Sequence, residues 1–202
     1  NISTRNVGGD IYAVESLQTW HTKEWKPIQS WKIGDLFLIL DLDLAPDGKK
    51  LVLSRTDTEN FAWEDAIEIW DLVNGNNSLT IRNPPSVWAV SFSPNGQTIA
   101  LFSRQNVGYL IAGVMKEWVT LIDSTNGEIL WSSEDLFTNK IKGLRGYYPD
   151  AMAWSNDGRL IAIGTSDGNI KILNGSDGKL LQTLTGHTMW VTGIQFSPDG
   201  RI

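Results

Sequence analysis

The chain of 202 residues has no cysteine, only two histidines and no long apolar run. Without cysteine it has no disulfide framework, no thiolate nucleophile and no thiolate metal site. His21 and His187 stand far apart in the sequence, so they do not form a metal-binding motif. A continuous run of about 20 apolar residues, the length that a membrane-spanning helix needs, is also missing. These absences predict a globular protein without a metal ion, a cofactor or a membrane span.

Charge of one sign is not concentrated anywhere in the chain. The 17 basic and 23 acidic residues give a net charge of −6, and no basic block is present. This balance argues against generic binding to nucleic acid or to an anionic membrane, because both attract positive charge. The first residue, Asn1, is not methionine, and no signal-peptide pattern follows it. We therefore expect protein partners, a cytoplasmic location, and a chain that begins inside a larger protein.

What the chain has instead is a short motif that returns along its length. In each copy, apolar residues stand two and four positions before the second residue of the motif, as Leu42 and Leu44 do in the first copy. This alternation predicts a strand with one buried face, followed by a tight turn in which glycine supplies backbone freedom. The copies are Ala-Pro-Asp-Gly at 45–48, Ser-Pro-Asn-Gly at 93–96, Ser-Asn-Asp-Gly at 155–158 and Ser-Pro-Asp-Gly at 197–200.

Each motif is followed by further apolar segments that complete a repeating unit. A second strand is expected at 50–54, 98–103 and 160–165, and a third at 67–70, 119–122 and 170–173. An Asn-Gly or Asp-Gly pair then turns the chain into a fourth strand. The sequence therefore predicts an all-β array of four-stranded antiparallel units. Arrays of this kind usually bind partners rather than catalyse reactions.

The connections between predicted strands differ in length at only one end of the units. In such a meander the first-to-second and third-to-fourth turns share one end, and they stay short in every copy. The second-to-third connections and the links between units lie at the other end, and these are expanded at 56–66, 105–116 and 134–148. Because loops accept insertions without disturbing the core and often carry function, we expect the binding surface at the variable end.

Several of these segments resemble the WD-repeat (WD40) family of β-propellers. The resemblance is carried by Gly186-His187 with Trp190-Val191 and the segment 196–200, by Trp70-Asp71 at the end of a third strand, and by the segment 166–172 that contains Asp167. It implies a β-propeller whose blades are the four-stranded units. In the family, a histidine, an aspartate, a serine or threonine and a tryptophan often form a structural hydrogen-bond set within one repeat.

The chain departs from the family pattern at most of these positions. Asp35, Asn83 and Arg145 occupy the histidine position of the other copies, so Asp167 lacks its histidine. The Trp-Asp pair is kept only at 70 and 71. We therefore expect the blades to depend more on apolar packing than on the polar set.

The predicted blades divide the chain into five parts of one propeller domain. These are a partial blade with a third and a fourth strand at 1–35, a blade at 36–81, a blade with a long loop at 82–133, a blade preceded by a long link at 134–185, and the start of a further blade at 186–202. Because family propellers usually have more blades, we expect a piece of a longer array. The alternative is a closed four-bladed ring whose last blade is shared by both termini.

Aromatic residues near the variable end are the candidates for partner contact. Trp88, Tyr148 and Trp190 stand where a link enters a first strand, which the family often uses for contact. Packing in the core is the competing interpretation for these three. Arg145, Tyr147, Trp63 and Trp118 flank or lie within the inserted segments and join them as weaker candidates.

No catalytic or phosphate-binding motif is found in the sequence. Asp41, Asp43 and Asp47 superficially resemble a calcium loop, but their spacing misses the required pattern, and Leu42 and Leu44 mark a strand. We therefore predict a non-catalytic scaffold that binds a protein or peptide. The alternatives are a regulatory or sensor propeller attached to an effector domain such as a kinase, an NTPase or a protease, a propeller hydrolase with a site in the central channel, and a structural spacer.

Overall fold

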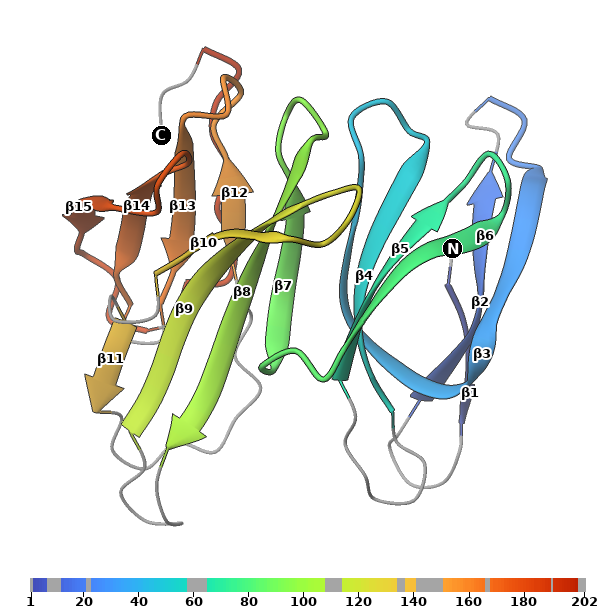
Figure 1. Ribbon diagram of the computed structural model, residues 1–202, viewed down its shortest axis with the longest axis horizontal. Coiled ribbons are helices and arrows are strands. Elements are labelled where there is room, and N and C mark those ends of the chain that lie inside the picture. Colours follow the sequence, from blue (N-terminus) through green and yellow to red (C-terminus); the bar gives the residue numbers. More distant parts are fainter. Residues whose placement is uncertain are drawn as a thin grey trace.

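The computed structural model describes residues 2–6, 12–20, 23–57, 65–107, 114–133, 137–140, 151–165, 168–189 and 191–199. Within these residues every regular element is a β-strand, and all strand pairs that form the sheets are antiparallel. No helix in this part of the chain is long and apolar enough to cross a membrane. The predicted all-β class is confirmed (Figure 1).

The first sheet joins the partial blade to the first complete blade. Its strands follow one another in chain order: β1 (Ile2–Asn6), β2 (Tyr12–Trp20), β3 (Pro27–Leu44), β4 (Lys50–Asp57), β5 (Asp65–Asp71) and β6 (Asn76–Arg82). The single long strand β3 pairs with β2 through its first part and with β4 through its last part. The predicted boundary between residues 35 and 36 therefore lies inside a strand. Strand β1 was not predicted, so the partial blade has one strand more than expected.

The second and third sheets are separate blades. The second runs in the order β10 (Ile129–Ser132), β9 (Val114–Asp123), β8 (Thr98–Val107) and β7 (Val87–Phe92), and the third in the order β12 (Met152–Trp154), β13 (Leu160–Gly164), β14 (Ile170–Asn174) and β15 (Leu180–Leu184). Strand β11 (Phe137–Lys140) also pairs with β9. It therefore extends the second blade, although the sequence placed it with the third.

The expanded connections are partly strand rather than loop. In the second blade, β8 and β9 stay paired as far as Val107 and Val114, so both ends of the predicted insertion 105–116 continue the hairpin. In the first blade, Thr56 pairs with Asp65, so the segment 56–66 also begins and ends in strand. The sequence missed the extensions at 104–107 and 114–118 because polar residues interrupt the apolar alternation in both segments.

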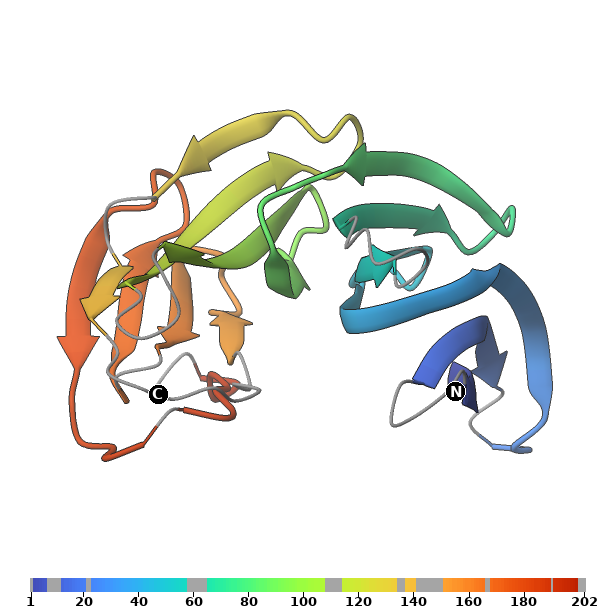
Figure 2. The same cartoon turned by 90° about the horizontal axis from the view of Figure 1, so that it is seen from below.

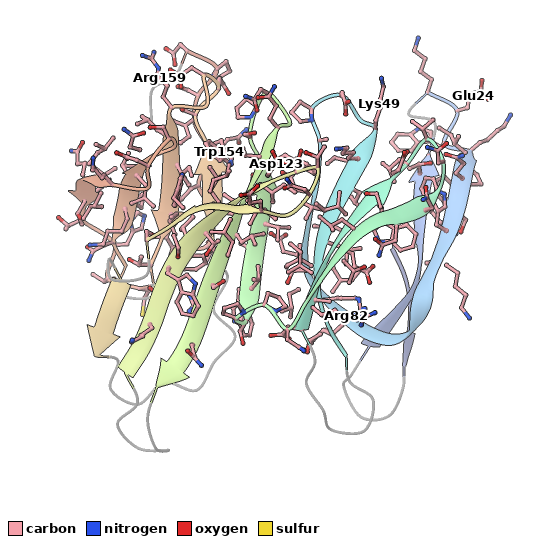
Figure 3. The ribbon with its side chains drawn as sticks, viewed as in Figure 1. Glu24, Lys49, Arg82, Asp123, Trp154 and Arg159 are labelled. Atoms are coloured by element: carbon pink, nitrogen blue, oxygen red, sulfur yellow. The ribbon has the colours of Figure 1, made fainter. Side chains whose placement is uncertain are left out.

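The sheets stand side by side and together form an open arc (Figure 2). The motif turns and the third-to-fourth turns gather at one end of the blades, which we call the turn end (Figure 1). Strand β4 ends and β5 begins at the opposite end, as do β8 and β9, and we call this the loop end. Lys49 and Arg159 mark the turn end and Arg82 marks the loop end (Figure 3). The predicted separation of the short turns from the connections at 56–66 and 105–116 is confirmed, whereas most of the link 134–148 lies outside the described residues.

The hydrophobic core consists of layers between neighbouring blades. One cluster joins Val52 and Ile69 of the first blade to Val90 and Ile122 of the second. Another joins the second blade to the third, a third joins the partial blade to the first, and a fourth covers the outer side of the third blade with Phe196. Because each sheet buries its apolar face only against the next sheet, the blades are stable as a stack rather than singly.

A glycine in each third-to-fourth turn allows the blades to approach closely. A Cβ at Gly178 would lie 2.5 Å from Cε3 of Trp131 in the previous blade, and one at Gly127 would lie 3.0 Å from Cδ2 of Leu79. Gly75 meets the indole of Trp31 in the same way. All three glycines have a positive φ, at +70°, +73° and +68° for Gly178, Gly127 and Gly75. Only glycine fits both the conformation and the space.

The last residue of each third strand explains which part of the Trp-Asp pair the fold needs. Oδ1 of Asp71 accepts a hydrogen bond of 2.8 Å from the backbone N–H of Val73. Oδ1 of Asp123 accepts one of 2.7 Å from the N–H of Thr125, and Oδ1 of Asn174 accepts one of 2.9 Å from Ser176. The acceptor oxygen is thus kept in all three blades although the tryptophan is not. Trp70 itself is buried and donates its Nε1 proton to Oε2 of Glu68 at 2.9 Å.

The other residues of the expected polar set lie only partly within the described residues. Asp167 lies outside the described residues, Gly186 has open space around its Cα, and the side chain of His187 is exposed. The backbone carbonyl of His187 lies where a Cβ at Gly168 would clash, at 2.6 Å. This segment therefore contacts the third blade through its backbone.

Two buried ion pairs lie inside the blades, beside the apolar layers. Nε of Arg55 lies 2.7 Å from Oε1 of Glu68, with 9% and 7% of the two side chains exposed. Nε of Arg104 lies 3.0 Å from Oε1 of Glu117, with 4% and 0% exposed. Each pair joins the second strand of a blade to the third, toward the loop end. At this depth of burial each charge depends on its partner, so the pair is sensitive to the loss of either member.

The contact between Gly178 and Trp131 is tested by Gly178→Ala against Gly48→Ala. Both glycines have φ near +70°, but a Cβ at Gly48 meets nothing within 4 Å. We expect Gly48→Ala to cost about 1 kcal/mol of unfolding free energy for its backbone conformation, and Gly178→Ala to cost about 1–3 kcal/mol more because the indole must move. Urea denaturation measures both values. Equal losses would show that the two blades are not in close contact there.

Removal of one member of a buried pair should be more damaging than removal of both. Glu68→Ala leaves the Arg55 guanidinium buried without this carboxylate and is expected to cost about 3–5 kcal/mol of unfolding free energy. The double variant Arg55→Met/Glu68→Met should lose less, because neither charge remains. The exposed Glu128 serves as control, and Glu128→Ala should stay within about 0.5 kcal/mol of the parent. A double variant that is less stable than the single variant would contradict this account.

Candidate functional site

The loop end holds only part of the predicted contact residues within the described chain. Trp88 is half-buried and is the second residue of β7, where the chain enters the second blade from the loop end. Five further candidates lie outside the described residues: Trp63, Arg145, Tyr147, Tyr148 and Trp190. Their grouping around Trp88 stays a prediction.

Trp118 occupies a different position from the one expected. It lies in β9 opposite Ser103, and 6% of the residue is exposed. The sequence placed it beside an inserted loop, but β9 begins four residues earlier, so the side chain is inside the paired region of the blade. Trp118 therefore offers little surface to a partner and contributes mainly to packing.

A polar pocket lies at the inner edge of the arc, where the first strands of successive blades meet. It has a volume of about 310 Å³ and is lined by Asp41 and Asp43 of β3, by Val90 and Ser91 of β7, and by residues 151, 152 and 192–194. This is the place where a central-channel enzyme would hold its catalytic groups. The sequence had placed the aspartates on a strand and had not connected them with a pocket.

Both carboxylates are engaged by the neighbouring blade. Oδ2 of Asp41 accepts a hydrogen bond of 2.8 Å from the N–H of Val90, and Oδ2 of Asp43 accepts one of 2.7 Å from the N–H of Phe92. The Oγ of Ser91 also donates to Asp43, at 3.2 Å. The two aspartates thus bind backbone N–H groups on the free edge of β7 and join two blades. Their role in the fold is structural.

The environment of Asp41 differs from that of an exposed carboxyl. Burial raises its pKa above the ordinary 3.8, while the hydrogen bond from Val90 acts in the opposite direction and the charge of Asp43 adds to the rise. The third aspartate of the apparent calcium pattern, Asp47, lies at the turn end and accepts a hydrogen bond of 2.9 Å from the N–H of Lys49. Within the described residues no group of three or more histidine, cysteine or acidic side chains is placed to hold a metal ion.

A larger pocket lies at the turn end between the second and third blades. It has a volume of about 910 Å³, and its walls include Leu130 of β10, Trp154 of β12 and Leu181 of β15. Leu130 and Leu181 are 50% and 55% exposed. The sequence gave no sign of this pocket, because its turns look uniform and its leucines come from separate repeats.

Asp41→Asn tests the electrostatic role of the inner edge through pH. Because the folded-state pKa of Asp41 is raised, the folded protein holds this proton more tightly, and ionisation lowers stability as pH rises through the window just above 3.8. The stability of the variant relative to the parent should therefore increase over the pH range that begins at 3.8. Thermal melts across this range measure the difference.

Asp71→Asn provides a control of opposite sign. Hydrogen bonds from the backbone and the side chain of Asn74 lower the pKa of Asp71, so its contribution is present above the unfolded-state pKa and is lost as pH falls. This variant should lose stability relative to the parent as pH rises. The same pH trend in both variants would contradict the assignment.

Comparison with known proteins agrees with the blade architecture. Residues 110–199 match the family described as anaphase-promoting complex subunit 4 WD40 domain. The chain is 26% identical over 147 residues to eukaryotic translation initiation factor 3 subunit I of Lodderomyces elongisporus, a match that covers 67% of this chain and 40% of that protein. It is 32% identical over 137 residues to an uncharacterized WD repeat-containing protein of Synechocystis sp., covering 63% and 36%.

A solved structure shares the fold at lower sequence identity. The crystal structure of RRP9 WD40 repeats matches with a TM-score of 0.58 and 17% identity, over 79% of this chain and 42% of that chain. The chain spans about 40% of the length of each of these proteins. Repeat motif, blade structure and matches agree, and the chain has the repeats and the blade architecture of the WD40-repeat β-propellers to which it is similar.

Proposed function

We propose that the chain is a non-catalytic scaffold that binds a protein or peptide partner at its loop end. Trp88, Tyr148 and Trp190 would form the centre of the contact. The connections at 56–66, 105–116 and 134–148 would set its specificity. A cytoplasmic location is part of the same proposal.

The observation that carries this proposal is that connections are uniform at the turn end of the blades and differ in length at the loop end. At the turn end every first-to-second turn has the same form, in which the glycine N–H of Gly48, Gly96 or Gly158 bonds to the carbonyl three residues before it at 2.8 Å. At the loop end, the second blade extends β8 and β9 well beyond the length of β13 and β14 in the third. A rigid stack with variation at one end suits selective binding at that end.

Two further points support binding over catalysis. The carboxylates of Asp41 and Asp43 at the inner edge are engaged with backbone N–H groups of the next blade, so they do not offer a free acid and base pair. One similar protein and the matching family carry names of subunits, of a translation initiation factor and of the anaphase-promoting complex. These names favour assembly with other proteins as the general role.

Alanine substitution of the three aromatic residues tests the proposal. The tagged chain and its Trp88→Ala/Tyr148→Ala/Trp190→Ala variant are used to capture partners from cell extract, and each captured protein is then produced and titrated calorimetrically. The variant should bind at least about 30-fold more weakly, as expected when central aromatic contacts worth about 2 kcal/mol or more are lost. Thermal stability should be close to that of the parent.

Two controls define the outcome. Leu44→Ala/Val73→Ala removes exposed apolar side chains at the turn end and should leave partner binding unchanged. Trp154→Ala removes an indole that packs between the second and third blades and should lower stability, which shows what loss of a core tryptophan looks like. A stable triple variant that binds its partners as tightly as the parent would refute the loop-end site.

A further inference from the structure

The turn end exposes large apolar side chains that the fold does not require. Among the residues whose side-chain exposure the structure describes, every exposed large hydrophobic one except Met189 lies in a turn of this end or in the strand end beside it. Exposed apolar groups that gather on one surface of a protein often mark an interaction site. They are Trp25, Ile28, Leu44, Val73, Ile129, Leu130, Leu180 and Leu181.

A comparison between blades identifies which of these residues are unusual. A bulge interrupts the pairing of the third and fourth strands in all three blades, and the residues left unpaired are Ser78, Leu130 and Leu181. Ser78 donates its hydroxyl proton to the carbonyl of Ile69 at 2.8 Å, so a small polar residue satisfies this position. The leucines of the second and third blades are therefore not needed for the bulge.

Both leucines line the same cavity, the pocket of about 910 Å³ between the second and third blades. We call it the leucine groove. Trp154, which also lines it, donates its only N–H to the carbonyl of Ser91 at 3.3 Å. The indole therefore presents only apolar surface to a molecule bound in the groove.

The polar residues around the leucine groove are occupied within the protein. Nδ2 of Asn156 donates to the carbonyls of Ser197 and Pro198 at 3.2 and 3.0 Å. Oδ1 of Asn95 accepts the N–H of Gln97 at 3.0 Å. Because these groups already have partners, binding in the groove would depend mainly on burial of apolar surface.

The charges of the leucine groove favour an uncharged occupant. Its lining contains one acidic and one basic residue, Asp157 and Arg159, and these form an ion pair with Nε and Oδ2 2.6 Å apart. The groove is therefore neutral in a chain whose net charge is −6. A charged segment would lose hydration there without gaining a free partner of opposite sign.

We propose that the leucine groove binds an uncharged segment of a partner protein through two apolar side chains, one against Leu130 and one against Leu181. The groove lies at the end opposite Trp88, so this interaction goes beyond the proposed loop-end binding and is independent of it. The scaffold would hold two polypeptides at once, one at each end of its blades.

Peptide selection against matched variants tests the leucine groove. A phage-displayed library of random 12-residue peptides is panned on the purified chain, and the enriched peptides are synthesised and titrated calorimetrically. The variant Leu130→Ser/Leu181→Ser places at both bulges the residue that the first blade has at Ser78. The control Leu44→Ser/Val73→Ser removes equally exposed side chains of the turn end that do not line the groove.

The expected result is a set of peptides with apolar side chains and no net charge. They should bind the parent and the control variant alike and bind Leu130→Ser/Leu181→Ser at least about tenfold more weakly. The melting temperatures of both variants should match that of the parent, because the replaced side chains are exposed. Binding should persist in Trp88→Ala/Tyr148→Ala/Trp190→Ala, which separates this site from the loop end.

Several outcomes would overturn the proposal. Peptides that bind the parent and Leu130→Ser/Leu181→Ser equally, peptides that are strongly charged, or a failure to enrich any peptide would each show that the groove is not such a site. Sedimentation velocity addresses a second copy of this chain as occupant. A parent that dimerises while Leu130→Ser/Leu181→Ser stays monomeric would assign the groove to self-association instead.

Discussion

Burial of each sheet against the next is the constraint on which the rest of this structure depends. A single four-stranded sheet cannot cover its own apolar face, so Val52 and Ile69 of one blade need Val90 and Ile122 of the next. Close approach also requires space, which Gly178 gives to Trp131 and Gly127 gives to Leu79. The same stacking aligns the blades, and it is this alignment that creates a turn end and a loop end.

The two ends and the inner edge use polar groups in different ways. At the inner edge, Asp41 and Asp43 accept hydrogen bonds from the backbone of the next blade, so these carboxylates join two blades. Toward the loop end, Arg55 and Glu68 form a buried pair inside a blade. At the turn end, backbone groups form hydrogen bonds within each turn. Exposed leucines are therefore the most distinctive feature of this surface.

Local features of the sequence were read correctly where a single segment determines its own structure. The motif turns, the alternating strands and the antiparallel order follow from glycine conformations and from period-two apolar patterns, and all are confirmed. Strand β1 and the extensions of β8 and β9 were missed because polar residues interrupt their apolar pattern and because they owe their structure to a paired neighbour. The burial of Trp118 was missed for the same reason.

The sequence by itself determined the repeating unit, its strand order and the end at which connections vary, because these depend on residues close together in the chain. Only the tertiary structure decided what distant residues do together. Asp41 meets Val90, Trp131 meets Gly178, and Leu130 faces the same groove as Leu181, although each pair is divided between two blades. Such contacts depend on how the blades stack, and no local pattern of residues records that geometry.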